Sequence, residues 1–139
     1  MIILDTNVLS ALMQTRPDPV VVAWLDGQAP ESVWTTAVSV FEIRFGIELL
    51  PPSRRRRALE EAFEAMVRDD LDGRVAAFDS AAADAAAALA ARRQRRGRPV
   101  DLRDTQIAGI ALARRAGLAT RNARHFEGLD VNVVNPWAG

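Results

Sequence analysis

The sequence predicts an α/β protein that forms one layered unit around a parallel sheet, and two observations indicate this class. Short apolar runs, the candidate strands, alternate with longer amphipathic segments at a spacing typical of strand–helix–strand units. The first run, Ile2–Leu4, is apolar without alternation, as in parallel strands that are buried on both faces. It ends on Asp5, and ligands of parallel α/β sheets bind beyond the carboxyl ends of the strands. Asp5 is therefore a candidate for chemistry, although Asp5, Thr6 or Asn7 could equally cap the next helix.

Length and composition favour a single domain over residues 1–139. A chain of this length has room for one proper core, and no linker, repeat or low-complexity segment divides it. Hydrophobic residues make up 49% of the chain and charged residues 26%, as in soluble globular proteins, and no apolar run is long enough to span a bilayer. The acidic residue at position 5 argues against a secretory signal, and the absence of cysteine fits a reducing compartment, so we expect a cytoplasmic protein.

The formal net charge is zero, but the basic residues are unusual in kind. All 18 are arginines, which excludes mechanisms that need a lysine, such as a phosphate-binding P-loop or Schiff-base chemistry. The absence of cysteine likewise excludes thiolate nucleophiles and thiolate metal sites. Codon bias of the genome could account for the use of arginine in place of lysine without any functional reason. The positions of the arginines are therefore more informative than their number.

Start and stop signals define the next elements. A short helix is expected over residues 8–13. Asp18 before Pro19 is typical of an N-cap with proline at the first helical position, and Gly27 ends the helix that they begin. Residues 32–35 form the second candidate strand.

The third predicted helix is capped by Thr36 or Ser39 and runs to about Leu50, before two prolines. Within it, Glu42 shares one face, at helical spacing, with Val38, Phe45, Gly46 and Leu49. We therefore expect Glu42 among apolar neighbours, where an unpaired ionised carboxylate is costly. Such a group is protonated, paired with an arginine or directed at a cation.

Two helices in the middle of the chain carry runs of arginine. The first, over residues 53–70, begins with Arg54 to Arg57, and four cations there oppose the helix dipole. This run is either a solvated face or a contact with a partner or polyanion. A short strand over residues 75–78 precedes the second helix, over residues 81–96, which Ser80 can cap. The arginines between Arg92 and Arg98 suit its C-terminal dipole, and RNA contact is the alternative.

Asp101 is the expected N-cap of the last long helix, which places Asp104 in the first turn. Asp104 shares a face with apolar residues at helical spacing, so it is expected to point toward the core, although capping alone could account for both acids. Gly117 is expected to end this helix. A strand over residues 118–120 then follows.

Asn122 stands directly after that strand, as Asp5 stands after the first one, so both are expected at the same edge of the sheet. Asparagine is also a common turn residue. His125, the single histidine, is either a structural residue or a supporting residue of the site. The last strand is expected over residues 131–134, and Trp137 is expected to cover an edge of the core.

Three carboxylates and one amide are thus placed at strand ends or on inward helix faces: Asp5, Glu42, Asp104 and Asn122. Their origin in four separate segments favours a metal site over four coincidences. Oxygen donors select hard cations such as Mg²⁺, which Mn²⁺ can replace. Because the chain has no cysteine or lysine nucleophile, a metal-activated water is the simplest route to hydrolysis. The arginine clusters then suit contacts with a nucleic-acid backbone.

Four ordered blocks also resemble the signature blocks of PIN-domain ribonucleases and, more narrowly, of the VapC toxins of toxin–antitoxin pairs. They are IILDTNVL at residues 2–9, VFEIRFG at 40–46, DTQIA at 104–108 and ATRN at 119–122. Two further segments, VAWLD at 22–26 and VNPW at 134–137, resemble the FitB branch of this family. The resemblance covers essentially the whole chain.

The resemblance implies a PIN-like three-layer α/β/α sandwich with a central, mainly parallel sheet, and a magnesium-dependent endoribonuclease. Carried over by position, Asp5 and Asp104 are the principal metal ligands. Glu42 completes the acidic set, either directly or through water.

Residues near the predicted ligands are assigned by the same resemblance. Thr6 and Thr120 support the site by hydrogen bonds, and Arg121 joins them as a substrate or supporting residue. Asn122 occupies the position of a fourth acid in many relatives and brings no charge. The number of bound metal ions, one or two, is therefore left open. His125 also stands where some relatives have an acid.

The resemblance further implies a homodimer and a small VapB- or FitA-like antitoxin, which occupies the active-site groove and often presents an arginine to the carboxylates. DNA would be bound only through that antitoxin. As a hypothesis, the helix that begins with Arg54 to Arg57 and its neighbour form the antitoxin groove. Two other functions are alternatives to a ribonuclease. The first is a catalytically silent PIN-like RNA- or protein-binding module. The second, a haloacid-dehalogenase-like phosphatase, is disfavoured, because Asn7 stands where that family has a second acid and the chain has no lysine.

Overall fold

The computed structural model describes residues 1–138 and contains a five-stranded parallel sheet at its centre. The strand order is β3-β2-β1-β4-β5, and each neighbouring pair is parallel. The first strand of the chain therefore lies in the middle, between the second and the fourth. The strands are β1 (Ile2–Leu4), β2 (Val33–Thr36), β3 (Val75–Ala76), β4 (Gly117–Ala119) and β5 (Val133–Val134).

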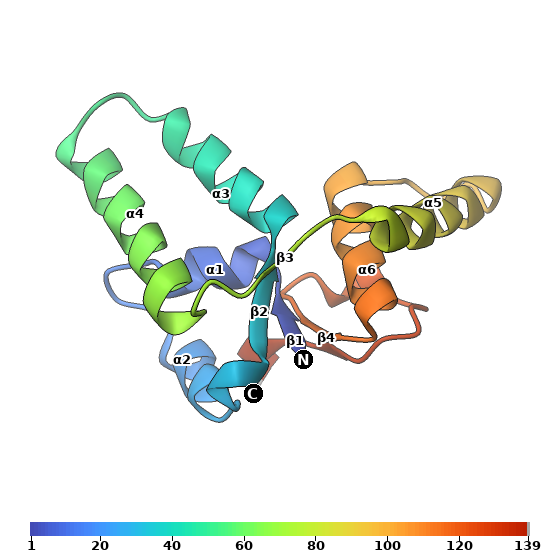
Figure 1. Cartoon of the computed structure of the whole chain (residues 1–139), viewed down its shortest axis with the longest axis horizontal. Coiled ribbons are helices and arrows are strands. Elements are labelled where there is room, and N and C mark those ends of the chain that lie inside the picture. Colours follow the sequence, from blue (N-terminus) through green and yellow to red (C-terminus); the bar gives the residue numbers. More distant parts are fainter. Residues whose placement is uncertain (139) are drawn as a thin grey trace.

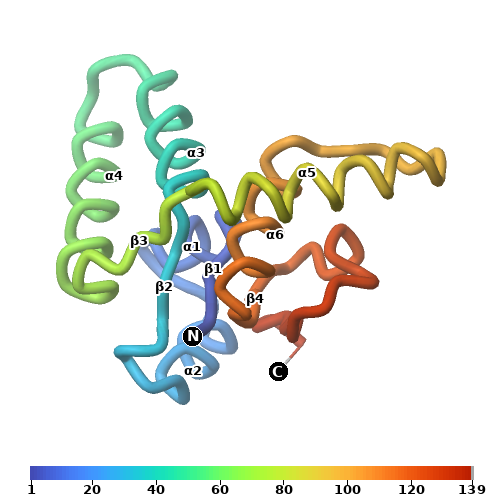
Figure 2. The backbone as a smooth tube through the Cα atoms, turned by 45° about the vertical axis from the view of Figure 1, so that its right-hand side comes forward, coloured from blue at the N-terminus to red at the C-terminus, as the bar shows by residue number. Residues whose placement is uncertain are grey.

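Six α-helices within these residues flank the sheet, which confirms the predicted three-layer α/β/α arrangement. In Figure 1, α3 and α4 form an antiparallel pair on one side, and α5 and α6 lie on the other. Figure 2 shows α5 projecting away from the body of the molecule. No helix among residues 1–138 is long and apolar enough to cross a membrane. The helices are α1 (Thr6–Leu12), α2 (Pro19–Asp26), α3 (Ala37–Glu48), α4 (Arg54–Ala65), α5 (Ser80–Arg95) and α6 (Leu102–Arg114).

Apolar residues pack on both faces of the sheet. In β1, Ile3 belongs to the cluster beneath α5 and α6, whereas its neighbour Leu4 belongs to the cluster beneath α1, α3 and α4. Successive strand residues point to opposite faces, so β1 is buried from both sides, as its unbroken apolar run predicts. Trp137 packs against the second cluster, as expected. The central strand is thereby packed on both faces, with Asp5 at its end.

The predicted caps of three helices are confirmed. Asp18 and Asp101 accept backbone hydrogen bonds from Val20 and Asp104, and Thr36, rather than Ser39, caps α3. Other predicted boundaries differ by a few residues: α4 ends at Ala65 and continues as a π-helical turn (Met66–Asp70), whereas β3 and β5 span two residues each.

Two predicted helix boundaries are wrong. Asp79, not Ser80, caps α5, because its backbone is extended and its carboxylate accepts from the N–H of Ala82. The last helix ends before Gly117: Arg115 adopts a left-handed conformation with φ of 53° and forms the C-cap. Gly117 begins β4 instead, paired with Ile2.

The predicted apolar face of α3 is also partly wrong. Val38 is buried, but Phe45, Gly46 and Leu49 are exposed, Leu49 by 70%. The buried face instead consists of Val38, Ser39, Ile43 and Ile47. Apolar side chains occur around much of this helix, and only the face that meets α1 and α4 can be buried.

Candidate active site

The carboxyl ends of β1 and β4 bring two polar side chains together. In the parallel register Leu4 pairs with Ala119, and the next residues along the two strands are Asp5 and Thr120. The backbone N–H of Asp5 donates to the carbonyl of Ala119 at 2.9 Å, which continues the ladder to the edge of the sheet. The predicted strand-end position of Asp5 is therefore observed.

Asp5 both caps α1 and faces the site, so the two interpretations of this residue are compatible. The residue is 3% exposed. Oδ1 accepts from the N–H of Thr6 at 2.8 Å, which is the capping bond, and Oδ2 accepts from the hydroxyl of Thr120 at 2.7 Å. Burial raises the pKa of Asp5, the hydrogen bonds from Thr120 and Thr6 lower it, and the charge of Asp104 raises it again, with a net increase.

Glu42 reaches the same region from α3. The hydroxyl of Thr6 lies 3.0 Å from Glu42 Oε1 and 2.9 Å from the hydroxyl of Ser39, so Thr6 links the start of α1 to α3. Glu42 Oε2 lies 3.6 Å from Nη1 of Arg103. Of the three states expected for this carboxylate, the structure shows the one paired with an arginine.

Asp104 lies in the first turn of α6, where Asp101 already serves as the cap. Its Oδ2 lies 2.8 Å from Nδ1 of His125. Burial raises the pKa of Asp104; contact with His125 lowers it, and the charges of Asp101 and Glu42 raise it, with a net increase. His125 thus contacts a site carboxylate directly, whereas the sequence left its role open.

The remaining predicted residues surround the carboxylates in different ways. Asn122 donates its backbone N–H to the Thr120 hydroxyl at 3.0 Å, and its side chain is exposed, without a hydrogen bond in the part of the chain that the structure describes. Arg121 lies over the ring of Trp137, with its guanidinium carbon 4.9 Å from the ring centroid. The structure therefore does not gather the Arg121 guanidinium with the carboxylates.

Two supporting contacts were missed by the sequence reasoning. Asn7 accepts from the N–H of Arg121 at 3.1 Å, which ties α1 to the segment after β4. Arg103 pairs with Glu42 across 61 positions of sequence. A half-buried carboxylate signals that a partner is needed, but 18 arginines offer no way to choose one before the fold is known.

The donor set suits a hard cation in its chemistry. Burial is the largest cause of the raised pKa of both Asp5 and Asp104, and neighbouring carboxylates raise each pKa further: Asp104 that of Asp5, and Asp101 and Glu42 that of Asp104. A bound cation would offset this negative charge. Within residues 1–138, no three acidic or histidine side chains are close enough to enclose an ion by themselves. This arrangement fits a cation such as Mg²⁺, which takes one or two protein carboxylates and completes its shell with water and phosphate.

Two grooves open from the site. The first, the α4 groove, has a volume of about 340 Å³ and lies between α1, α3 and α4, with Thr6, Glu42 and Arg103 at its mouth. It continues as a hollow of about 780 Å³ along α4, and the two parts share Met13, Gln14, Arg55 and Leu59. The second, the α5 groove, has a volume of about 530 Å³ beside Asp104 and continues as a hollow of about 230 Å³ at the end of α5. The charged side chains that line its two parts away from the site include Arg92, Arg93, Arg96, Arg98, Arg124 and Glu127.

The chain is similar to known proteins over nearly its whole length. The family model described as the PIN domain matches residues 2–131. The chain is 38% identical over 137 residues to the VapC ribonuclease Y4jK of Sinorhizobium fredii, covering 99% of this chain and 98% of the relative. It is 35% identical to the toxin FitB of Neisseria gonorrhoeae, covering 99% of both chains. The crystal structure of FitAcB from Neisseria gonorrhoeae superposes with a TM-score of 0.88 at 35% identity, again over 99% of both chains.

Proposed function

The chain belongs to the PIN-domain family, and from that premise we propose that it is a VapC-type endoribonuclease, the toxin of a toxin–antitoxin pair, with magnesium-dependent activity. The observation that carries the proposal is the convergence of Asp5, Glu42 and Asp104 at one edge of the parallel sheet. These carboxylates come from the end of β1, from α3 and from α6. Asp5 and Asp104 have raised pKa values, first because they are buried and then because other carboxylates lie near them, and perturbed carboxylates of this kind are typical of functional sites.

We assign the ligand role to Asp5 and Asp104, with Mg²⁺ as the cofactor and Mn²⁺ as a substitute. When bound, such a cation supplies an activated water as nucleophile and offsets negative charge on the scissile phosphodiester. Glu42 completes the acidic set, and Asn122 is the neutral fourth member on the exposed side.

The surrounding residues hold these side chains in place. Thr120 and the N–H of Thr6 fix both oxygens of Asp5, while the Thr6 hydroxyl fixes Glu42. His125 fixes Asp104 through Oδ2. Such outer contacts set the orientation of ligands and their affinity for a metal.

The test is cleavage of a total RNA pool by the purified, antitoxin-free protein, with magnesium or with a chelator. Asp104→Asn is compared with Asp84→Asn, which removes one exposed charge from α5, away from the site. Discrete fragments that require both magnesium and Asp104, and that Asp84→Asn still produces, support the proposal. A folded wild-type protein that binds magnesium but cleaves no RNA contradicts it and favours a catalytically silent PIN-like binding module.

We further propose that a VapB- or FitA-like antitoxin occupies the α4 groove and reaches Glu42 at its mouth. The groove offers apolar side chains such as Ile43, Ile47 and Leu59 beside Arg55. Within the run from Arg54 to Arg57, Arg56 is already engaged: it pairs with Glu48 and Glu60, each at 2.9 Å. That part of the run is structural, so the proposal rests on the groove and not on the number of arginines. DNA contact belongs to the antitoxin.

We also propose that the chain forms a homodimer. Large apolar side chains are exposed along α3 and at the start of α6, as a ridge made of Phe41, Phe45, Leu49 and Leu102. Clusters of this kind mark protein interfaces.

A further inference from the structure

We propose that the α5 groove carries the phosphate backbone of the RNA on one side of the scissile bond. This inference rests on the proposed ribonuclease function and adds the path of the substrate to it. The α5 groove begins at Asp104 and His125, so a strand whose phosphate lies at the site enters the groove directly.

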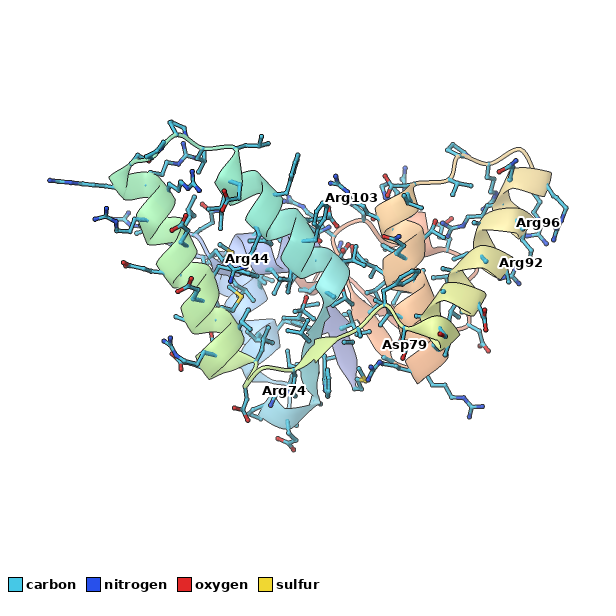
Figure 3. All side chains as sticks on the ribbon, turned by 45° about the horizontal axis from the view of Figure 1, so that its top comes forward. Arg44, Arg74, Asp79, Arg92, Arg96 and Arg103 are labelled. Atoms are coloured by element: carbon cyan, nitrogen blue, oxygen red, sulfur yellow. The ribbon has the colours of Figure 1, made fainter. Side chains whose placement is uncertain are left out.

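The groove is continuous from the site to the end of α5. Its inner part, beside Asp104, and its outer part, beside Leu89 and Gly128, share Arg93, Arg98 and Glu127 in their walls. In Figure 3, Arg92 and Arg96 lie along the projecting end of α5, where the outer part of the groove ends. A chain-like ligand can therefore follow the groove outward from the carboxylates.

The guanidinium groups of this groove are available to a ligand. No ion pair within residues 1–138 engages any of its five arginines. Arg93 donates to the backbone carbonyl of His125 at 2.7 Å, a neutral acceptor, so it keeps its full charge while holding the wall in place. Three acids line the inner part of the groove, namely Asp101, which caps α6, Asp104 of the site, and Glu127; of these, only Glu127 also lines the outer part.

The helix dipole does not account for this arrangement. It explains basic residues in the last turn of α5, such as Arg92. It does not explain Arg98, in the loop after α5, or Arg124, in the 3-10 helix η3 (Ala123–Phe126), which line the same groove from separate segments. Three segments that converge with free positive charge indicate a polyanionic ligand.

Arginines that contact phosphates contribute affinity without reading bases. For single-stranded nucleic acid, each lost phosphate contact lowers the salt dependence of log K by about 0.7. The α5 groove is therefore expected to supply affinity and orientation, whereas the choice of cleavage site comes from contacts elsewhere.

The test is RNA binding by a triple variant with one substitution in each segment: Arg92→Gln, Arg98→Gln and Arg124→Gln. The probes are a fluorescein-labelled single-stranded oligouridine and a labelled tRNA pool, followed by anisotropy in chelator so that no cleavage occurs. The control triple is Arg16→Gln, Arg68→Gln and Arg114→Gln, which removes the same charge from exposed positions outside both grooves.

We expect the groove triple to raise Kd by about tenfold or more at moderate salt and to reduce the salt slope by about 2, with the control changing Kd less than about twofold. The matching Arg→Lys triple retains the charge and is expected to restore most of the affinity, which separates charge from folding. Equal binding by the groove and control triples overturns the inference.

The two proposals fail in different ways. If wild type cleaves RNA with magnesium but both Gln triples bind alike, the groove assignment is wrong and the ribonuclease proposal stands. If wild type binds RNA through the groove but never cleaves it, the ribonuclease proposal is wrong and the groove assignment stands.

Discussion

Thr120 contributes one buried hydroxyl that organises the end of β4. The hydroxyl donates to Asp5 at 2.7 Å and accepts from the N–H of Asn122 at 3.0 Å and from the side-chain amide of Asn7 at 3.4 Å, and the residue is fully buried. Thr120→Val keeps the shape but removes all three bonds. We expect it to destabilise the fold by about 1–3 kcal/mol, because buried partners lose their hydrogen bonds. We also expect RNA cleavage to fall by about 10- to 100-fold, as for other contacts that orient metal ligands.

Thr120→Ser is the matched control, since it keeps the hydroxyl and removes only a methyl group worth about 1 kcal/mol. Thermal unfolding and the initial rate of RNA cleavage measure the two effects. Wild-type cleavage by Thr120→Val would show that the hydroxyl does not orient Asp5 for function.

Asp104 gives a prediction about pH in the metal-free protein. Because its pKa is raised above 3.8 in the folded state, the folded protein binds this proton more readily than the unfolded chain does. Stability from this group is therefore greatest at low pH and is lost as the pH rises through the folded pKa. Asp104→Asn removes the ionisable group, so in chelator we expect it to be more stable than wild type at pH 7.

The stability advantage of Asp104→Asn should shrink as the pH falls toward 3.8, where Asp104 of wild type becomes neutral. Urea unfolding of both proteins at several pH values measures the difference in free energy of unfolding. Added Mg²⁺ should stabilise wild type more than the variant. An advantage that is independent of pH would contradict the raised pKa of Asp104.

At the scale of elements, the contact between α5 and α6 depends on a glycine. A Cβ placed on Gly109 would lie 2.5 Å from the carbonyl oxygen of Ala82 and 2.7 Å from the Cβ of Ala86. Backbone atoms cannot move aside as a flexible side chain can, so Gly109→Ala must separate the two helices. We expect a loss of about 1–3 kcal/mol in the free energy of unfolding, measured by urea denaturation.

Gly46 in α3 provides the control for that substitution. A Cβ there would meet no atom within 4 Å, and the residue lies in a helix interior. Gly46→Ala is therefore expected to stabilise the protein by about 0.5–1 kcal/mol, since alanine favours helix over glycine. If both substitutions changed stability by the same amount, close packing of α5 on α6 would not be the cause.

Strand and helix positions, and the caps at Asp18, Thr36 and Asp101, follow from local signals that act within a few residues. The end of α6 was not predictable in this way, because Gly117 is recruited into β4 by pairing with Ile2, more than a hundred positions away. The exposure of Phe45 and Leu49 was not predictable from the sequence either, since only tertiary packing decides which apolar face of α3 is buried.

The site shows the same division between local and long-range information. Asp5 and Asp104 could be placed because each follows an element boundary that the sequence marks. The partners of the site carboxylates, Arg103 for Glu42 and His125 for Asp104, come from other segments and required the fold. Local patterns therefore predict the chemistry of the donors, whereas their contacts depend on the whole chain.

At the scale of the whole molecule, the carboxylates lie between two grooves of different character. The α4 groove combines apolar side chains with Glu42 at its mouth, and the α5 groove is lined by arginines beside Asp104 that form no ion pair within residues 1–138. An antitoxin in the first groove and RNA backbone in the second would meet at the same carboxylates. Under the two proposals, inhibition needs an antitoxin to cover only this meeting point and not the whole path of the RNA.

The exposed ridge, defined above by Phe41, Phe45, Leu49 and Leu102, makes a prediction about assembly. In the isolated chain the Phe41 and Phe45 rings stack at 6.0 Å, with the Arg103 guanidinium over both, and Leu49 remains 70% exposed. A twofold dimer brings the same patch of both copies together, so one substitution acts twice in the interface. We expect Phe45→Ser with Leu49→Ser to convert a dimer into a monomer.

Sedimentation equilibrium measures the change as a fall from twice the mass of the chain to one chain mass. The control is Val20→Ser with Phe78→Ser, two apolar residues outside the ridge that are exposed by 44% and 37%, in α2 and in the loop between β3 and α5. It also replaces two exposed apolar side chains by serine and should leave the dimer intact. A double variant of the ridge that still sediments as a dimer would place the interface elsewhere. Loss of antitoxin binding by that variant would then assign the ridge to the antitoxin, because contiguous exposed apolar side chains mark interaction sites.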